Sequence, residues 1–413
     1  MNEIELILIN ISGDDRPGVT SALTEILARH DAQILDIGQS DIHHKLSLGV
    51  LFRTTSDKSG DVMKDLLFKC YDLGVKIRFT PITVEDYEAW VAREGKSRWI
   101  ITILGRTLTA KNIALVSAEI ARQHLNIDSI RRLTGRQPLS DKIEPRSKSC
   151  VEFSVRGNPD DVDAMRSRFM EISQADGFDI SLQEDNVFRR CRRLICFDMD
   201  STLIETEVID ELADCAGVGP EVRAITESAM RGEIDFSESF KRRVALLKGL
   251  DESVMRDIAE KLPITEGVER MMQVLKRTGY KTAILSGGFT YFGNYLKQKF
   301  GFDYVYANEL EIVDGKLTGR HLGDIVDGKR KAELLKIIAQ VENINIAQTI
   351  AVGDGANDLP MLSTAGLGIA FHAKPKVKRT ARQSISTIGL DGVLYFLGFK
   401  DSLITDRCAP CSE

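Results

Sequence analysis

The sequence predicts an α/β protein in which a doubly wound parallel sheet with a helical cap follows two smaller α+β units. The segment 194–197 is continuously apolar and stops at two aspartates, which is typical of a buried strand of a parallel sheet. Strand and helix patterns alternate after it, and one order of strands and helices occurs twice before it. We therefore expect domains at residues 1–85, 97–184 and 185–413, with the cap at about 208–262.

Composition and charge exclude several classes of protein. The 413 residues exceed what one core sustains, and the 43% hydrophobic and 28% charged residues are ordinary for a soluble chain. A net charge of −6 argues against a nucleic-acid partner. No apolar run approaches the roughly 18 residues that span a bilayer, and no basic segment of a signal peptide opens the chain. We expect a cytoplasmic protein without a membrane or nucleic-acid partner.

The cysteines do not predict a disulfide framework or a metal site. Their number is odd, seven, and they are scattered through the chain. Cys408 and Cys411 form a Cys-x-x-Cys pair near the C-terminus, but there is no second pair to complete a zinc site. We expect this tail to be unstructured.

The first small unit is predicted to have the order βαββαβ. Apolar spacing favours strands and helices in turn at residues 4–10, 19–30, 32–39, 46–53, 60–73 and 75–82, the helices being 19–30 and 60–73. A turn at 13–18 opens the first helix, and Asp15 is a candidate for its N-terminal cap. This order is that of a complete ferredoxin-like α+β domain.

The second small unit repeats the pattern. Its strands and helices are expected in turn at residues 99–105, 112–124, 127–133, 150–156, 160–175 and 178–183, the helices being 112–124 and 160–175. Similar helix endings, Ala-Arg-His at 28–30 and Arg-Gln-His at 122–124, lie 94 residues apart and indicate an internal duplication. Residues 85–96 link the copies, and residues 134–149 replace a tight turn by a long loop.

The two units resemble ACT domains, small regulatory modules that often bind amino acids across paired copies. In the first copy, Asp-Arg-Pro-Gly at 15–18 matches the ligand-binding members. The glycine lets the backbone approach a ligand, and the following helix N-terminus attracts a carboxylate. The resemblance implies Asp15 and Gly18 as regulatory residues, serine or another amino acid as effector, and a homodimer. The second copy reads Thr-Ala-Lys-Asn at 109–112, a departure from that motif, and the alternative is that both copies serve only to dimerise.

The third region reads as a parallel sheet with a helical insertion. Further strands are expected at residues 282–285, 304–307, 349–352, 367–370 and 384–386, with a hairpin at 311–318 that turns at Asp314-Gly315. Between the first strand and the rest, helices are expected at 208–216, 220–231, 236–247 and 252–262. An insertion directly after the acidic strand end would cover the site as a cap.

The two aspartates at the end of the first strand predict a cation site. Asp198 and Asp200 lie where an open α/β sheet binds its ligands. Carboxylates so close repel unless a cation lies between them or they share a proton, and we expect Mg²⁺. A solvated turn is the alternative meaning of Asp-x-Asp.

Three later features complete a set suited to phosphoryl chemistry. Ser286-Gly287-Gly288 offers a hydroxyl and backbone N–H groups to phosphate oxygens. Lys331, early in a helix expected at 331–341, supplies a positive charge, and the segment 353–358, Gly-Asp-Gly-Ala-Asn-Asp, supplies further carboxylates. Each feature alone is a weak signal, but their order along the chain makes the set specific.

This set, with the helical insertion after its first member, resembles the haloacid dehalogenase superfamily of phosphotransferases. The resemblance implies that Asp198 attacks phosphorus and becomes an aspartyl phosphate, and that Asp200 acts first as general acid and then as general base. It implies that Mg²⁺ is held by the carboxylates of Asp198 and Asp354 and the backbone carbonyl of Asp200. Ser286, Gly287 and Lys331 are implied to hold the phosphoryl group. Asn357 and Asp358 are implied to support the far side of the site.

Within that superfamily, residues 190–395 resemble most closely the phosphoserine phosphatase family. The resemblance implies that Glu207 binds the substrate ammonium group, that Arg243 binds its carboxylate, and that Met230 and Phe236 wall the pocket. Glu207 as a helix cap and Arg243 on a solvated face are the alternatives. We expect hydrolysis of O-phosphoserine to serine and phosphate, the last step of serine biosynthesis. The rival hypotheses are an amino-acid sensor with a vestigial catalytic domain and a phosphatase for another small phosphomonoester.

Overall fold

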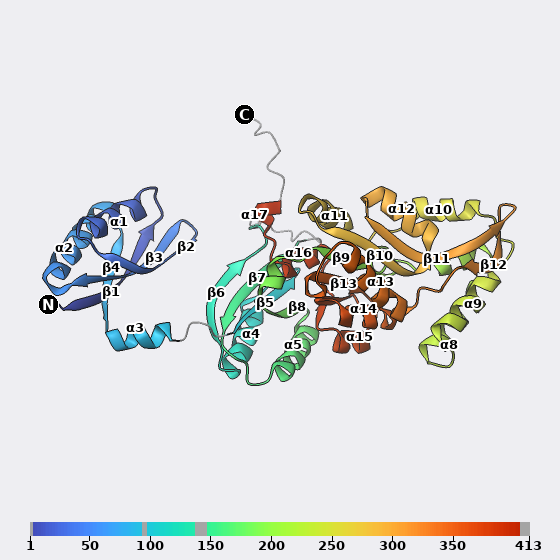
Figure 1. Ribbon diagram of the computed structural model, residues 1–413, viewed down its shortest axis with the longest axis horizontal. Coiled ribbons are helices and arrows are strands. Elements are labelled where there is room, and N and C mark those ends of the chain that lie inside the picture. Colours follow the sequence, from blue (N-terminus) through green and yellow to red (C-terminus); the bar gives the residue numbers. More distant parts are fainter. Residues whose placement is uncertain (1–2, 93–96, 137–146, 405–413) are drawn as a thin grey trace, which may run out of the picture. The chain divides into compact units, whose positions relative to one another are not determined.

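The computed structural model describes residues 3–92, 97–136 and 147–404, and the chain divides into two compact units, 1–96 and 97–413 (Figure 1). The expected boundaries 1–85, 97–184 and 185–413 stay predictions. The tail with Cys408 and Cys411 and most of the long loop lie outside the described residues. Within the described part, no helix combines the length and apolarity that crossing a membrane needs.

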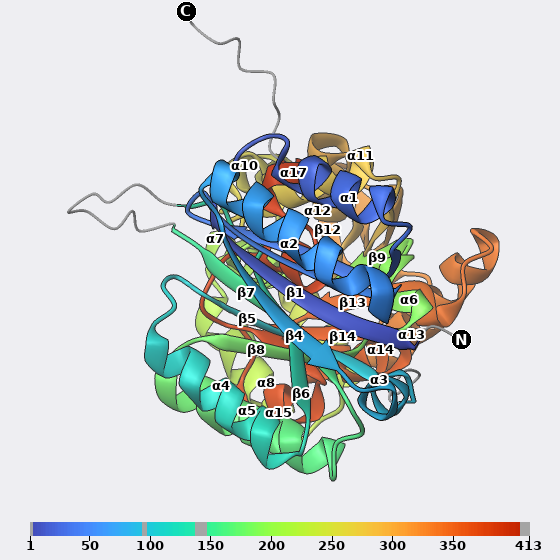
Figure 2. The ribbon, with the colours of Figure 1, turned by 90° about the vertical axis from the view of Figure 1, so that its left-hand side faces the viewer.

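The first unit is a four-stranded antiparallel sheet with two helices on one face. Its strands are in the order β2-β3-β1-β4. Ile7, Ile9 and Ile11 of β1 are buried against α1 and α2, which lie side by side across the sheet in Figure 2. This alternation is that of a strand covered on one side only. The elements are β1 Ile4–Asp14, α1 Val19–Arg29, β2 Gln33–Ile42, β3 Lys45–Thr55, α2 Ser56–Leu73 and β4 Lys76–Ile82, followed by α3 Val84–Val91.

Two local predictions for this unit are wrong. Asp15 does not cap α1, because the N-cap position is Gly18 (φ 94°) and no side chain accepts a hydrogen bond there. The backbone N–H of Asp15 instead donates to the carbonyl of His44 (2.8 Å), which holds Asp15 in the preceding turn. Helix α2 begins at Ser56, ahead of the expected start at residue 60, because Gly60 is tolerated inside the helix. The expected linker at 85–96 begins with the helix α3.

The second unit opens with a repeat of the same topology. Its first sheet has the order β6-β7-β5-β8, which matches the order in the first unit position by position. Helix α4 differs from α1 at its start, because Thr109 and Asn112 form a reciprocal capping box. The elements are β5 Arg98–Gly105, α4 Ala110–Arg122, β6 Asn126–Arg132, β7 Ser149–Arg156, α5 Val162–Asp176 and β8 Asp179–Glu184.

A seven-stranded sheet forms the core of the rest of the unit, in the order β12-β11-β10-β9-β13-β14-β15. Strand β9, Leu194–Phe197, is parallel to both β10, Lys281–Phe289, and β13, Thr349–Gly353. The chain passes from β9 to β10 and β11 on one side of it and returns later to β13 on the other side, so the strand order reverses at β9 and its carboxyl end is a topological switch point. The outer strands are β11 Tyr304–Val313, β12 Lys316–Leu322, β14 Leu367–Phe371 and β15 Gln383–Ile385.

Helices cover both faces of this sheet, which confirms the predicted doubly wound class. Ile195 and Phe197 of β9 pack in the apolar cluster that contains α11 Val268–Arg277 and α12 Thr290–Phe300. Leu194 and Cys196 pack in a second cluster, with α13 Gly328–Val341 and α14 Leu359–Thr364. Burial on both faces explains why β9 reads as continuously apolar. The remaining short helices are α6 Val187–Arg190, η1 Ile346–Gln348, η2 Ala356–Asp358, α15 Pro375–Thr380, α16 Gly392–Phe396 and α17 Asp401–Ile404.

The helical insertion forms as predicted, with ends that shift by a residue. Its helices are α7 Val208–Cys215, α8 Gly219–Met230, α9 Phe236–Leu246 and α10 Ser253–Lys261. The predicted hairpin is also present, since Val313 pairs with Lys316 and the turn residues Asp314 and Gly315 have φ of 50° and 75°. Helix α13 starts earlier than expected because Asp327 caps the N–H of Arg330 (2.8 Å).

The second small domain is joined to the seven-stranded sheet by buried contacts. Asp179, at the start of β8, is fully buried and accepts hydrogen bonds from the N–H of Ser386 (2.9 Å), the N–H of Thr387 (3.0 Å) and the hydroxyl of Thr387 (2.6 Å). The side-chain amide of Gln383 pairs with the backbone N–H and carbonyl of Leu182 at 3.1 and 2.7 Å. These two domains therefore form one unit.

Candidate active site

The candidate site is built at the carboxyl end of β9. Asp198 directly follows this strand, and its backbone N–H donates to the carbonyl of Val352 in β13 (2.9 Å). Asp198 and Asp200 are both buried. The strand order thus brings the end of β9 beside the ends of its two neighbours, β10 and β13.

The end of β10 brings the predicted phosphate-binding residues close to Asp200. The hydroxyl of Ser286, which is fully buried, accepts a hydrogen bond from the N–H of Gly288 (2.9 Å). A Cβ at Gly288 would lie 2.6 Å from Oδ2 of Asp200, and a Cβ at Gly287 would lie 2.9 Å from Cζ of Phe236. Only glycine permits this close approach at both positions.

Asn308 is a residue of this region that the sequence analysis missed. Its side-chain amide donates to the carbonyl of Gly287 (2.8 Å), and its side-chain oxygen accepts from the N–H of Val326 (2.8 Å). Asn308 therefore holds the glycine loop to the segment that leads into α13. The residue lies outside the four motifs, and the signal that could have found it is a polar side chain directly after the strand expected at 304–307.

Lys331 lies between two of the aspartates. Its Nζ is 2.7 Å from Oδ1 of Asp198 and 2.7 Å from Oδ1 of Asp358. The side chain is 1% exposed, which is rare for a lysine and requires such pairing. Asp358 also accepts from the N–H of Gly355 (2.9 Å), so it fixes both the lysine and the loop after β13.

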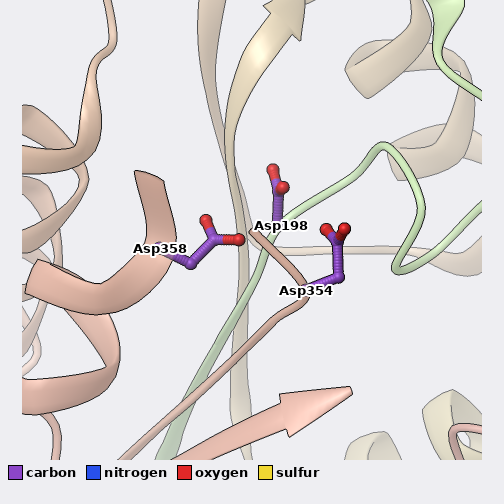
Figure 3. Close-up of side chains that lie close together, drawn as sticks. All are labelled: Asp198, Asp354 and Asp358. Carbon is purple, nitrogen blue, oxygen red and sulfur yellow. The ribbon is translucent and has the colours of Figure 1, made fainter. Parts of the chain in front are cut away.

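Three carboxyl groups converge beside the lysine. Asp198, Asp354 and Asp358 each offer an oxygen within 4.8 Å of the others, and Figure 3 shows the three side chains gathered at the strand ends. The first two belong to the predicted metal set of Asp198, Asp200 and Asp354. Asp358 is not in that set. The sequence predicted it among the further carboxylates of the segment 353–358, and its carboxylate lies in the cluster.

The electrostatics of this cluster favour a cation. Burial first, then the neighbouring carboxylates, raise the pKa of Asp198 to about 7 and that of Asp354 to about 8. Burial and the charges of Glu207 and Asp198 hold the pKa of Asp200 well above its usual range. Burial alone would lower the pKa of Lys331, but Asp198 and Asp358 outweigh it and raise that pKa. Among these carboxyl groups, Lys331 forms ion pairs with Asp198 and Asp358.

Hard oxygen donors in this number suit a divalent cation such as Mg²⁺. Three carboxylate oxygens that lie within 4.8 Å of one another could bind such an ion together. Burial, and then the neighbouring carboxylates, raise the pKa of Asp198 and of Asp354, and a bound cation would act in the opposite direction. The residues present therefore fit a metal centre.

The alternatives for the two predicted substrate ligands of the cap were that Glu207 caps a helix and that Arg243 lies on a solvated face. The structure supports neither alternative. Glu207 is the N-cap residue of α7, but its side chain makes no capping hydrogen bond and accepts instead from the hydroxyl of Ser201 (2.9 Å). Arg243 is half-buried, whereas its neighbours Lys241 and Arg242 are exposed. Burial lowers the pKa of Arg243, while the charges of Glu207, Asp210 and Asp200 act in the opposite direction. Both side chains therefore lie within electrostatic reach of the acidic cluster.

The remaining predicted contacts are distributed around the site. Phe236 contacts Gly287 and stacks on Phe240, with ring centroids 6.3 Å apart. Met230, the last residue of α8, is 63% exposed, and its sulfur lies 3.8 Å from Nζ of Lys374. Asn357 is half-buried, and its carbonyl packs against Gly328 at the start of α13. The roles predicted for these side chains stay predictions.

A cavity of about 410 Å³ opens beside the carboxylates. Asp354, Ser201 and Glu205 line it from the catalytic domain, and Arg106 lines it from the second small domain. Arg106, which is far from the motifs in sequence, therefore lines the same cavity as Asp354.

In the first unit, the two predicted regulatory residues lie in one turn. Asp15 is exposed, and Gly18 has a left-handed φ of 94° with nothing within 4 Å of where a Cβ would be. The start of α1 is therefore open, as the predicted ligand site requires.

Comparison with protein families identifies the domains. Models of the ACT domain match residues 5–80 and 97–183, and a model of haloacid dehalogenase-like hydrolases matches residues 195–363.

Two curated relatives match nearly the whole chain. A phosphoserine phosphatase of Streptomyces coelicolor is 38% identical over 397 residues, which are 96% of this chain and 93% of the relative. The phosphoserine phosphatase SerB2 of Mycobacterium tuberculosis is 39% identical over 394 residues, which are 95% of this chain and 93% of the relative.

Two solved structures share the fold. A probable phosphoserine phosphatase from Vibrio cholerae, in unliganded form, has a TM-score of 0.57 at 36% identity, over 74% of this chain and 87% of that one. A HAD family hydrolase from Salmonella enterica serovar Typhi has a TM-score of 0.62 at 31% identity, over 75% of this chain and 99% of that one. The chain belongs to the phosphoserine phosphatase family, with two ACT domains ahead of a haloacid dehalogenase-like hydrolase domain.

Proposed function

We propose that this protein hydrolyses O-phospho-L-serine to L-serine and phosphate, as the last step of serine biosynthesis. The observation that carries the proposal is the contact of Asp198 with Lys331 (2.7 Å) inside a buried cluster of carboxylates at the end of β9. The membership of the phosphoserine phosphatase family supports the choice of substrate. The intact set of charged groups disfavours a vestigial catalytic domain.

Asp198 is the nucleophile in this proposal. Its carboxylate oxygen attacks phosphorus and forms an aspartyl phosphate, while Asp200 gives its proton to the departing serine oxygen. The pKa of Asp200, raised by burial, favours the protonated form that this step needs. Asp200 then takes a proton from the water that hydrolyses the intermediate.

The charge that develops on the phosphoryl group needs donors already in place. Lys331 supplies a buried positive charge, and Ser286 and Gly287 supply hydroxyl and backbone N–H groups at the end of β10. Mg²⁺, held by Asp198 and Asp354 and by the backbone carbonyl of Asp200, would neutralise further charge on the phosphoryl oxygens. The close carboxylates and their raised pKa values support this assignment.

The serine part of the substrate is assigned to the cap. Glu207 would bind the ammonium group and Arg243 the carboxylate, with Phe236 and Met230 as walls and Asn357 near the phosphoryl group. The charge of Glu207 raises the pKa of Asp200, and the charges of Glu207 and Asp200 act on the pKa of Arg243, which supports the assignment of both side chains to the substrate.

A phosphate-release assay with Mg²⁺ and a panel of phosphomonoesters tests the proposal. We expect O-phosphoserine to be the preferred substrate and Asp198→Asn to release no phosphate, because the amide keeps the shape but is not a nucleophile. Asp257→Asn, an exposed aspartate on α10, is the matched control and should retain full activity. Turnover by Asp198→Asn would remove Asp198 from the mechanism.

The cap assignment has its own test. Glu207→Gln should raise KM for O-phosphoserine about 10- to 100-fold, because the amide keeps an acceptor but removes the negative charge that pairs with the ammonium group. Glu238→Gln, an exposed glutamate of the cap that pairs with Arg242, should leave KM unchanged. An unchanged KM in Glu207→Gln would favour another small phosphomonoester as substrate.

We further propose that serine binds the first ACT domain around Asp15 and Gly18 and modulates activity, and that the protein is a homodimer. The open start of α1 supports the first point. The exposed edge strand β2, with Ile37 47% and Ile42 77% exposed, supports the second. Calorimetry with serine tests the first proposal, and the absence of a binding heat would contradict it. The molecular mass in solution tests the second, and the mass of a monomer would contradict it.

We also propose that the protein works in the cytoplasm. The described cysteines, Cys70, Cys150, Cys191, Cys196 and Cys215, are free thiols, which suits a reducing compartment.

A further inference from the structure

Two basic side chains of the second ACT domain contact the catalytic domain where the cap ends. Arg106, which follows β5, forms a two-pronged ion pair with Glu266, with Nη1 2.9 Å from Oε1 and Nη2 2.6 Å from Oε2. Lys148 lies 3.9 Å from the same carboxylate and 2.6 Å from Oδ1 of Asp391. A planar guanidinium bound through both nitrogens fixes the orientation of its partner as well as its distance.

Glu266 belongs to the segment through which the chain returns from the cap. The outgoing and returning segments, residues 203–207 and 262–266, are here called the cap hinge. They pair with each other, since Ile204 forms a bridge with Ile264 and the N–H of Thr265 donates to the carbonyl of Leu203 (3.1 Å). A displacement of Glu266 would therefore move both segments, including Glu207 at the start of α7.

The returning segment is packed against the catalytic domain with little free space. The carbonyl of Glu266 accepts from the N–H of Leu390 (2.7 Å), and a Cβ at Gly389 would lie 2.4 Å from that oxygen. Gly267 has a φ of 89°, and a Cβ there would lie 2.3 Å from Oδ1 of Asp391. At this packing density a small change in Glu266 is transmitted rather than absorbed.

Asp391 extends the network on the other side. It is fully buried and accepts hydrogen bonds from Lys148 and from Arg270 (2.7 Å). The second ACT domain therefore supplies two cations, Arg106 and Lys148, to a network that fixes the cap hinge. Arg106 also lines the cavity of about 410 Å³ together with Glu205 of the hinge and Asp354 of the carboxylate cluster.

We propose that Arg106 is a positioning residue which, through Glu266, holds the cap hinge so that Glu207 and Arg243 face the phosphoryl-binding groups. This rests on the proposed function, in which the cap binds the ammonium and carboxylate of the substrate. Arg106 should therefore affect substrates that carry those groups, and should leave phosphoryl transfer from a simple phosphomonoester nearly unchanged.

Steady-state kinetics of the full chain test this with two substrates. For Arg106→Ala we expect kcat/KM to fall about 10-fold for O-phosphoserine and less than about twofold for p-nitrophenyl phosphate, which has no ammonium or carboxylate. Arg106→Lys keeps the charge but loses the fork, and should show an intermediate loss. Arg168→Ala, which removes an exposed ion pair with Glu171 inside the same ACT domain, is the matched control and should change neither substrate.

A double-mutant cycle shows whether Arg106 acts through Glu266. Glu266→Gln should shift the ratio of the two substrates as Arg106→Ala does, and the double variant should be no worse than either single variant. Equal losses for both substrates in Arg106→Ala, or fully additive losses in the double variant, would overturn the proposal.

Amide hydrogen exchange separates this inference from the proposed function. Arg106→Ala, or Arg106→Lys if the alanine variant does not fold, should exchange faster than the wild type at 203–207 and 262–266 and equally in β1 and β3 of the first unit. Unchanged exchange at the cap hinge contradicts the role of Arg106 whatever the substrate is. A wild type that does not hydrolyse O-phosphoserine contradicts the proposed function, and the exchange result still decides on the hinge.

Discussion

The two ACT domains share one topology and differ in what surrounds it. The edge strand β4 of the first copy, Lys76–Ile82, is only partly buried, whereas the equivalent β8, Asp179–Glu184, is buried along almost its whole length. The difference arises because β8 packs beside β15 of the catalytic sheet, through Asp179 and Gln383. The second copy is therefore a structural part of the catalytic unit, while the first is a compact unit of its own.

The starts of their first helices differ in the same sense. Helix α1 begins after its N-cap residue Gly18 and has no side-chain cap, whereas the capping box of Thr109 and Asn112 closes the start of α4. An open helix start can accept a ligand carboxylate, and a capped one already has its N–H groups satisfied. The two copies of one fold thus differ in that the first has an open helix start and the second is packed against the catalytic sheet.

The largest effect should come from truncation. A chain of residues 97–413 should melt like the catalytic unit of the full protein and keep its phosphatase activity. A chain of residues 185–413 loses Lys148 from the buried Asp391 and all contacts of Asp179, and should melt about 10 °C lower or aggregate. Scanning calorimetry and phosphate release compare the two. Equal stability of both truncated chains would break the distinction between the copies.

A single substitution in the contact between β8 and the catalytic sheet should lower the stability by less than this truncation. Asp179→Ala leaves the N–H groups of Ser386 and Thr387 without their acceptor and should lower the free energy of unfolding by about 3 kcal/mol. Lys76→Ala, at the first residue of the equivalent strand in the other copy, is exposed and should change it by less than about 0.5 kcal/mol. Urea unfolding measures both variants. Similar losses of unfolding free energy would mean that the contact of β8 with the catalytic sheet does not stabilise the protein.

Magnesium should stabilise the second copy and not the first. The pKa values of Asp198 and Asp354, about 7 and about 8, lie above the values of about 4 in an unfolded chain. Without a cation, the stability linked to these groups is present below about pH 4 and is lost as pH rises through 7 to 8. Protons compete with Mg²⁺ for the same oxygens, so Mg²⁺ should stabilise more at pH 8 than at pH 6.

Melting with and without Mg²⁺ at both pH values checks this. At 100 times its dissociation constant Mg²⁺ adds about 2.7 kcal/mol. Amide exchange should show the added protection in β5 and β7 but not in β1 and β3. A shift that is independent of pH, or equal protection of the two ACT domains, would contradict the prediction.

The smallest effects should separate the two helix starts. Gly18→Ala forces a side chain into a left-handed conformation and should cost about 1 kcal/mol of stability. Thr109→Ala removes a cap and should also cost about 1 kcal/mol. Only Gly18→Ala should reduce the heat of serine binding in calorimetry. Loss of binding in Thr109→Ala instead would place the ligand in the second copy.

Much of the fold could be read from the sequence because its signals are local. The cap helices appear within one residue of the predicted ends, and the hairpin at Asp314-Gly315 forms as expected. The prediction of the N-terminal cap of α1 was wrong, because a polar residue before a helix can either cap it or lie in the preceding turn. Asp15 has the chemistry of a helix cap, but the chain needed a left-handed residue at Gly18 before α1 could begin.

The sequence by itself determined where the candidate site lies. Asp198, Ser286 and Asp354 each follow a segment with the apolar pattern of a strand, and the carboxyl ends of adjacent parallel strands meet at one edge of the sheet. The order of these strands along the chain therefore implies that the three residues lie close together, and the structure at the ends of β9, β10 and β13 agrees with this.

Only the tertiary structure decided which charges pair. Lys331 is shared by Asp198 and Asp358, Arg106 binds Glu266, and Asp179 binds Thr387. An ion pair between residues 160 positions apart leaves no periodicity and no motif in the chain, because it depends on how two separate surfaces meet. For that reason the second ACT domain reads from the sequence as a regulatory copy, and its place as a wall of the catalytic unit becomes visible only when the domains are packed.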